Sequence, residues 1–148
     1  MARWLADPEF TRHLMGPQPR SEAEAMLARI DAHWDEHGFG ALAVEDRASG
    51  ALIGRTGPAY HRAWPHDPEV GWWTAPELQG RGLATEAGRA SVEWTFGELG
   101  FARVVSITTA GNLASLRVME KLGFRLQAKV PLPDDGRELL VHALERAP

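Results

Sequence analysis

The stretch Gln79-Gly80-Arg81-Gly82-Leu83-Ala84 lies between an apolar extended run at 70–74 and a segment of helical periodicity that continues to about Leu99. This order of strand, glycine turn and helix start predicts an anion site. The first backbone N–H groups of a helix have no intrahelical partner, and the helix dipole favours negative charge there. Glycine also lets the main chain approach a phosphate closely. We therefore expect a ligand that carries phosphate.

A capping box at Ser21 and Glu24 predicts a helix upstream of this turn. Gly38 is expected to end the helix after about His37. Its apolar residues recur at helical spacing: Ala25, Met26, Ile30 and Trp34. His33 and His37 match a zinc-peptidase pattern, but no downstream glutamate segment offers a third ligand. We expect a solvated helix face there and no metal.

A hairpin is predicted next, from strands at 39–45 and 51–57 joined by a short turn. The prolines at 58, 65 and 68 are expected to keep the chain irregular after it. The strand that precedes the glycine turn then begins at Glu69.

A β-α-β unit is predicted around the glycine turn. The strand at 69–74 precedes the turn, and the helix after it carries one apolar face: Leu83, Ala87, Ala90 and Trp94. Gly97 and Gly100 are expected to close this helix, and β-branched residues predict a buried strand at 103–108. A helical crossover places the two strands parallel.

The C-terminal part adds a helix and a last hairpin. Asn112 can cap a helix at 113–122 that Gly123 ends, and the hairpin turns at Asp134-Asp135-Gly136. Together the elements imply an α/β (α+β) fold, a mixed sheet with helices on both faces. At 148 residues, without a repeat or a linker, the chain is expected to form one domain over residues 1–148.

Composition excludes several classes of function. No apolar run approaches the roughly 20 residues that span a bilayer, and the N-terminus carries no secretory signal, so we expect a cytoplasmic protein without a membrane segment. The net charge of −4 has the wrong sign for nucleic-acid binding through the overall field. With no cysteine, the chain has no thiol nucleophile and no cysteine zinc site.

Two common phosphate-binding motifs do not match the glycine turn. A dinucleotide fingerprint needs a third glycine where Thr85 stands, and the next strand ends without an acidic residue for a ribose. A P-loop needs Gly-Lys-Ser/Thr, which is missing. Taken alone, Gly80 and Gly82 are equally compatible with a plain tight turn.

A second motif resolves this choice. The segment from Asn112 to Phe124 contains Asn112-x-x-Ser115 and ends in Glu-Lys-Leu-Gly-Phe. Together with Gln79-x-x-Gly-x-Ala84 it resembles the GNAT acetyltransferase superfamily over about residues 4 to 146. Three further features look like the RimJ/RimL branch, which acetylates amines including protein N-termini: the segment Glu69-Val70-Gly71-Trp72-Trp73, the segment Thr85-Glu86-Ala87, and Ser115.

The resemblance implies an acetyl-CoA site and the GNAT fold, a mostly antiparallel mixed sheet whose central parallel pair splays apart. The turn would hold the pyrophosphate, the edge of the strand at 72–74 would pair with the pantetheine amides, and Asn112 would face them from the other side. Asn112 is also a good plain helix cap. The residues implied in acetyl-CoA binding are Trp72, Trp73, Thr74, Gln79, Gly80, Arg81, Gly82, Leu83, Ala84, Thr85, Asn112 and Ser115.

Direct attack of an amine on the thioester is favoured, because the chain lacks a thiol for an acyl-enzyme, although a serine ester is formally open. Glu69 is the candidate base, directly or through water, with Asp67 and His66 as substitutes; Glu69 can equally be an ordinary exposed strand-end carboxylate. Many family members carry a tyrosine acid where Met119 stands, so Ser115 is the candidate acid, or else a helix-turn serine. The N–H of residue 73 or 74 would stabilise the oxyanion.

The acceptor is expected to be a primary amine. An α-amine, with a pKa near ~8, is far more often neutral at pH 7 than a lysine near ~10.4, so a peptide N-terminus asks less of the base. Trp64, Trp72 and Trp73 are candidates for an apolar acceptor pocket, whereas Trp34 and Trp94 are expected in the core. A polyamine or aminoglycoside acceptor, or a catalytically silent acyl-CoA-binding module, are the alternatives.

The chain departs from the family at its start, where members carry a strand before the helix that leads to Asp7-Pro8-Glu9. Either this strand is absent or the start codon has been set too late, and in both cases the hairpin at 39–57 is expected to have an unpaired edge. Exposed edges invite pairing with another chain, so we expect a homodimer across this edge.

Overall fold

The computed structural model describes residues 1–14, 16–132 and 136–147. Its elements, in chain order, are α1 (Ala2–Leu5), α2 (Pro8–Thr11), α3 (Arg20–His37), β1 (Leu42–Glu45), β2 (Leu52–His61), β3 (Trp64–Thr74), the 3-10 turn η1 (Pro76–Leu78), α4 (Leu83–Gly97), β4 (Arg103–Thr108), α5 (Leu113–Leu122), β5 (Arg125–Pro131) and β6 (Glu138–Glu145). None of the described helices is long and apolar enough to cross a membrane.

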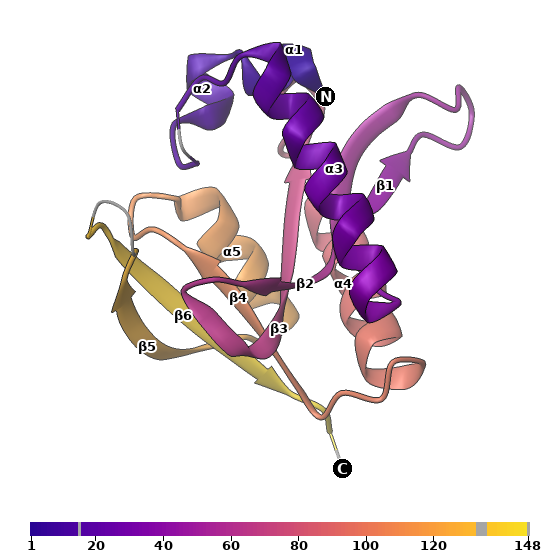
Figure 1. Cartoon of the computed structure of the whole chain (residues 1–148). Coiled ribbons are helices and arrows are strands. Elements are labelled where there is room, and N and C mark those ends of the chain that lie inside the picture. The colour runs from indigo at the N-terminus through magenta and orange to yellow at the C-terminus, as the bar shows by residue number, and fades with distance from the viewer. Residues whose placement is uncertain (15, 133–135, 148) are drawn as a thin grey trace.

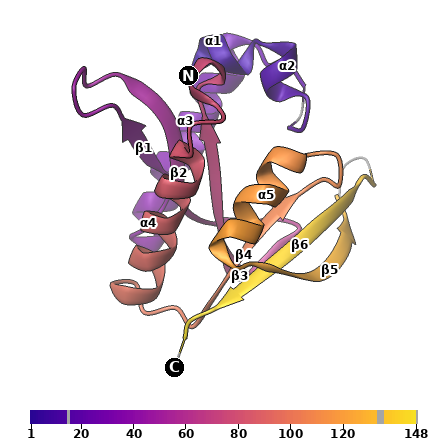
Figure 2. The ribbon, with the colours of Figure 1, turned by 180° about the vertical axis from the view of Figure 1, so that it is seen from behind.

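A single mixed sheet organises these elements in the order β1-β2-β3-β4-β6-β5. Only β3 and β4 run parallel among the neighbouring strands described. Helix α3 covers one face (Figure 1), and α4 and α5 cover the other, as the reverse view shows (Figure 2). The predicted architecture of a mixed sheet between helices is therefore confirmed.

The parallel strands β3 and β4 separate soon after they meet. Their register contains the single pair Glu69↔Val105. Strand β3 continues to Thr74 alongside β2, and β4 continues to Thr108 alongside β6. The sheet thus opens at its centre beyond Glu69, and main-chain groups of β3 face the opening without a strand partner.

The core lies between the sheet and the helices α4 and α5. Val70 and Val104 from the central strands pack with Val92, Met119 and Phe124, and all are nearly inaccessible to solvent. Gly88 lets α4 approach closely, because a Cβ there would lie 3.0 Å from Leu122 and 3.1 Å from the Trp72 ring. This packing anchors the two helices on either side of the opening.

The prolines do not interrupt the strands, so the predicted irregular segment at 58–68 is wrong. Strand β2 continues through Pro58 to His61, and β3 begins at Trp64. Pro58 lies beyond Leu42, the first residue of the neighbouring β1, so its missing N–H removes no ladder bond on that side. Pro65 and Pro68 lie where the β2–β3 register is irregular.

The predictions of helix ends from local sequence signals were partly right. The left-handed φ of Gly38 and Gly123 ends α3 and α5 as predicted. The capping box is wrong, because α3 begins at Arg20 after Pro19, and this places Ser21 inside the helix. The hairpin of β5 and β6 is confirmed, while Asp134 and Asp135 of its predicted turn lie outside the described residues.

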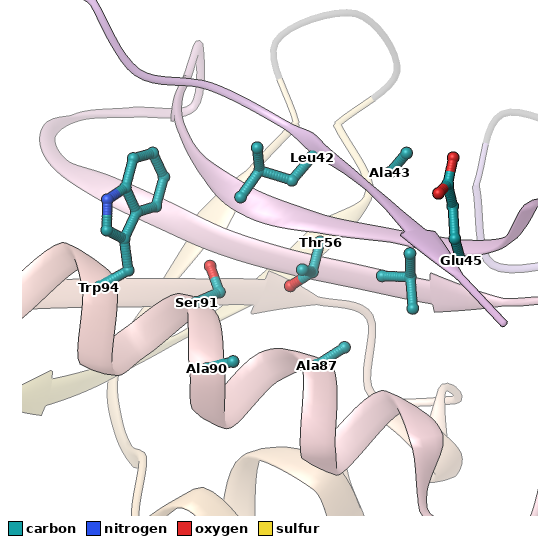
Figure 3. Close-up of a pocket in the computed structure, with 9 residues that line it drawn as sticks. Leu42, Ala43, Glu45, Thr56, Ala87, Ala90, Ser91 and Trp94 are labelled. Atoms are coloured by element: carbon teal, nitrogen blue, oxygen red, sulfur yellow. The ribbon is translucent and has the colours of Figure 1, made fainter. Parts of the chain in front are cut away.

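The predicted apolar face of α4 does not point into the core. The buried positions of α4 are Gly88, Ser91, Val92 and Thr95. The predicted residues Ala87, Ala90 and Trp94 instead line a groove of about 300 Å³ against β1 (Figure 3). Trp94 also stacks on Trp34 of α3 with ring centroids 6.0 Å apart, and neither ring is fully buried. The apolar stripe formed by Ala87, Ala90 and Trp94 therefore faces the β1 edge of the sheet and not the core.

Candidate active site

The glycine turn forms the N-terminus of α4. Gly80 and Gly82 have φ of 78° and 83°, in the left-handed region, and Leu83 begins the helix. No side chain caps this end, and the first helical bond described runs from the Glu86 N–H to the Gly82 oxygen at 3.0 Å. The N–H groups from Leu83 to Thr85 are thus available to an anion.

Asn112 and Ser115 lie at the N-terminus of α5, across the opening. The Asn112 Oδ1 accepts a hydrogen bond from the Ser115 N–H at 3.2 Å, which confirms Asn112 as a helix cap. Among the described residues no hydrogen bond involves the Ser115 hydroxyl, which remains available to a ligand.

Both motifs line one cavity of about 630 Å³. Every residue predicted for cofactor binding contributes to its wall except Arg81, which is exposed on the turn. Sequence reasoning missed the wall supplied by α2 and the segment after it: Asp7, Glu9, Phe10, Arg12, His13 and Leu14. Asp7 followed by Pro8 marks a helix start, but nothing local to it indicates that it meets residues 72–85 in space.

The edge of β3 presents main-chain groups to the opening. The Ala75 N–H donates to the Ile53 oxygen of β2 at 2.8 Å. In an antiparallel ladder, alternate residues bond to the same neighbour, so the N–H of Trp73 points to β2 and those of Trp72 and Thr74 point into the opening. Of the two predicted oxyanion donors, Thr74 has the suitable orientation. Gln79 Nε2 donates to the Thr74 oxygen at 3.4 Å and ties the turn to this edge.

Trp72, which lines the cavity, carries an unsatisfied donor on its indole. Its Nε1 is buried and has no hydrogen-bond partner among the described residues. Leaving a buried donor unpaired costs about 1–3 kcal/mol. An acceptor atom on a bound ligand would remove this cost.

Two cations stand one helical turn apart on the α5 side of the cavity. Arg117 and Lys121 both line it and are exposed, and no ion pair to either occurs in the described part of the chain. In a chain of net charge −4, unpaired cations that line the same cavity as the free helix N-terminus of α4 favour a ligand with several negative charges.

Glu69 lies in the interior of β3, partly buried, so its interpretation as an exposed strand-end carboxylate is wrong. Burial raises the pKa of Glu69 to about 7, and the charge of Arg55 and a hydrogen bond from the Ile107 N–H partly oppose this rise. Glu69 is not part of the wall of the 630 Å³ cavity. It lies where β3 and β4 part, on the face that carries Trp73 and opposite that of Trp72.

The substitutes for Glu69 are occupied or exposed. The Asp67 Oδ2 accepts from the Trp64 indole at 3.0 Å and faces Arg103 at 3.5 Å, so neither Asp67 nor Trp64 is free. His66 is exposed and packs edge-on against Trp64.

Trp73, a candidate for the acceptor pocket, contacts the Trp4 and Phe10 rings at centroid distances of 5.2 and 5.6 Å.

His33, the first histidine of the zinc-like pattern, contacts the main chain. His33 Nδ1 lies 2.8 Å from the Phe39 oxygen, and its Nε2 accepts from the Tyr60 N–H at 3.1 Å. Both ring nitrogens of His33 are therefore engaged, and neither is available to a metal ion.

Solved structures with the same architecture cover nearly the whole chain. An acetyltransferase from Agrobacterium tumefaciens superposes with a TM-score of 0.85 at 28% identity, covering 98% of this chain and 82% of that one. A "Putative GnaT-family acetyltransferase" from Bordetella pertussis superposes with a TM-score of 0.79 at 32% identity, covering 95% and 87%.

Curated relatives match over shorter segments. "Uncharacterized N-acetyltransferase YnaD" of Bacillus subtilis is 38% identical over 60 residues, 40% of this chain and 35% of that protein. "Putative ribosomal N-acetyltransferase YdaF" of the same organism is 38% identical over 61 residues, 41% of this chain and 33% of that protein. The matched segment is thus about a third of the length of these two relatives. The family model of the acetyltransferase (GNAT) domain, a family whose acetyl donor is acetyl-CoA, matches residues 1–125, and the chain belongs to this family.

Proposed function

We propose that this chain is a single-domain cytoplasmic N-acetyltransferase that transfers the acetyl group of acetyl-CoA directly to a primary amine. One observation carries the proposal: the glycine turn of α4 and the Asn112 segment of α5, far apart in sequence, line the same cavity of about 630 Å³. The unpaired Trp72 Nε1 and the uncapped N-terminus of α4 fit the acceptor atoms and phosphates of this donor.

Different residues of the cavity would bind different parts of acetyl-CoA. The N–H groups of the turn from Gln79 to Thr85, with Arg81 beside it, would hold the pyrophosphate. The free edge of β3 from Trp72 to Thr74 would pair with the pantetheine amides as an added strand does. Asn112 and Ser115 would contact the pantetheine from the side of α5, and Arg117 with Lys121 would meet the remaining phosphate charge.

The transfer needs a base, an oxyanion donor and an acid. Glu69, directly or through a water, would take a proton as the amine nitrogen attacks the thioester carbon. The Thr74 N–H would stabilise the oxyanion, and Ser115 would return a proton to the sulfur as the C–S bond breaks. A pKa near 7 suits a base at neutral pH, since both protonation states are populated.

A protein or peptide α-amine is the proposed acceptor class, as the resemblance to the RimJ/RimL branch implies. An α-amine has a pKa near ~8, which a base near 7 matches better than a lysine near ~10.4. The name of the relative YdaF, a putative ribosomal N-acetyltransferase, fits a protein acceptor for that relative.

An acceptor panel tests the function. Purified protein with acetyl-CoA should release free CoA and form acetylated product with at least one N-terminal peptide, and less readily with polyamines or aminoglycosides. Mass spectrometry of the product locates the acetyl group. Binding of CoA without turnover of any acceptor would favour the alternative, a silent acyl-CoA-binding module.

We also propose a homodimer across the edge of β1. This strand ends the sheet, and its Leu42 and Val44, with the apolar stripe of α4, leave the groove of Figure 3 along that edge. Pairing of two β1 edges would extend the sheet and cover the groove.

Light scattering at micromolar concentration should give about twice the mass of one chain. The Leu42→Lys variant should give the mass of a single chain. Leu126→Lys is the matched control, because Leu126 is exposed on β5 at the opposite edge of the sheet. A monomeric mass for the unmodified protein would refute the dimer.

A further inference from the structure

Arg55 and Glu69 share one face of the sheet. The β2–β3 register pairs Arg55 with Trp73, Gly57 with Gly71 and Ala59 with Glu69. Because side chains alternate along strands, these pairs lie on the same face, away from α4 and α5. The pair between Arg55 and Glu69 consists of two glycines, so no side chain from β2 or β3 stands between the guanidinium and the carboxylate.

The carboxylate of Glu69 is directed along this gap. Its Oε1 lies 4.0 Å from the position that a Cβ of Gly71 would occupy, so the side chain folds over Gly71 toward the end of the face that carries Arg55. The Ile107 N–H donates to the carboxylate from β4. Glu69 therefore accepts from a main-chain donor on β4, and the charge of Arg55 acts on it across the gap without an ion pair within 4.0 Å.

Arg55 has no other partner in the described part of the chain. It is partly buried, and burial lowers its pKa while the charge of Glu69 raises it. Arg55 forms no hydrogen bond and no ion pair within 4.0 Å with any described residue. A guanidinium withdrawn from water needs a compensating charge, and Glu69 supplies it.

The other charged groups near this face are compensated among themselves. On β3 and β4, Asp67 faces Arg103 at 3.5 Å, and Arg103 faces Glu145 of β6 at 3.3 Å. Helices α1 and α2 contribute Trp4 and Phe10 against Trp73.

Of the acidic residues at α2, Asp7 accepts from the main-chain N–H of Glu9 at 2.8 Å, and the Glu9 carboxylate pairs with Arg12 at 3.0 Å. Arg55 is thus the side-chain charge that acts on Glu69.

We propose that Arg55 is the positioning residue of the base: across the pair of glycines its positive charge draws the Glu69 carboxylate over Gly71 and favours the proton-accepting form at neutral pH. The inference rests on the proposed role of Glu69 in acetyl transfer. Without Arg55, burial would act on Glu69 almost unopposed, and the carboxyl would stay protonated to higher pH.

Arg55→Met tests this through the pH dependence of kcat/KM. The pH at which kcat/KM falls on the acid side should rise by about one unit, and activity should be largely regained above this pH. Below it, kcat/KM of the variant should be about tenfold lower than that of the unmodified enzyme. Arg55→Lys should restore most of the original profile, and Arg47→Met in the exposed β1–β2 turn is the matched control. Arg55→Gln replaces the methionine variant if that fails to fold.

A second measurement does not depend on activity. In carbon-labelled ligand-free protein, the side-chain carboxyl signal of Glu69, identified by its absence from Glu69→Gln, should titrate about one pH unit higher in Arg55→Met. An unchanged midpoint, a superposable rate profile or a loss equal at every pH would overturn the inference. An enzyme inactive toward every acceptor would refute the proposed function, while the titration would still decide the role of Arg55.

Discussion

Glu69→Gln is expected to lower kcat for acetyl transfer by about 10²- to 10⁴-fold at pH 7.5, the usual contribution of a general base. The unmodified enzyme should lose activity as pH falls through about 7, since protonated Glu69 accepts no proton. The glutamine variant should lack this decrease in rate near pH 7. Its pH dependence should reflect only the protonation of the amine acceptor. Initial rates between pH 5.5 and 9 with one peptide acceptor measure both effects.

The stability of the same variant separates catalysis from folding. In the folded protein the Glu69 pKa is about 7, above its ordinary value of 4.5, so the proton favours folding at low pH. This contribution is complete below 4.5 and is lost as pH rises through 7. Neutral glutamine avoids the loss, so the variant should be more stable at pH 8, by about 3 kcal/mol.

Near pH 4.5 the difference in the free energy of unfolding should be small. A lower melting temperature at pH 8 would contradict the buried carboxyl, and unchanged kcat would refute its role as base.

Gly82→Val is expected to weaken CoA binding at least about tenfold, to the point where CoA no longer raises the melting temperature measurably. Valine rarely adopts the φ of 83° found here, and it costs about 1–3 kcal/mol to hold it there. The turn would relax, and the N–H groups of Leu83 to Thr85 would no longer converge. Titration calorimetry with CoA measures the loss.

Gly50→Val is the matched control for this strain. Gly50 has φ of 68° and lies in the β1–β2 turn, and apart from its chain neighbours no atom lies within 4 Å of the place that a Cβ would take. Both variants should lose similar stability without ligand, but only Gly82→Val should lose the response to CoA. Equal affinity in the two variants would show that the turn does not hold the pyrophosphate.

Local chemistry explains which features could be predicted. Gly38, Gly82 and Gly123 take a left-handed φ at helix ends, a conformation that side chains disfavour, and Asn112 caps α5 with its own side chain. Such signals act within a few residues, so they can be recognised without the rest of the fold. With the apolar and β-branched patterns they were enough to predict the β-α-β unit, while the two motifs of the cavity were recognised from their resemblance to the GNAT family.

Signals that depend on neighbours led to wrong predictions. The stripe of Ala87, Ala90 and Trp94 has the periodicity of a core face, yet the core takes Gly88 and Val92, because the Trp72 ring requires a small residue beneath it. Periodicity shows that a helix has an apolar face and says nothing of which partner covers it.

Contiguous residues were enough to predict most of the element order, the glycine turn at the start of α4 and the family to which the two motifs belong, because each of these is a local pattern. Three-dimensional packing was needed to establish that the segment around Phe10 joins the cavity, that Glu69 is partly buried, and that Arg55 shares its face. Burial and the pairing of charges depend on strand register and on where two strands separate. These are relations between distant segments, which no local pattern encodes.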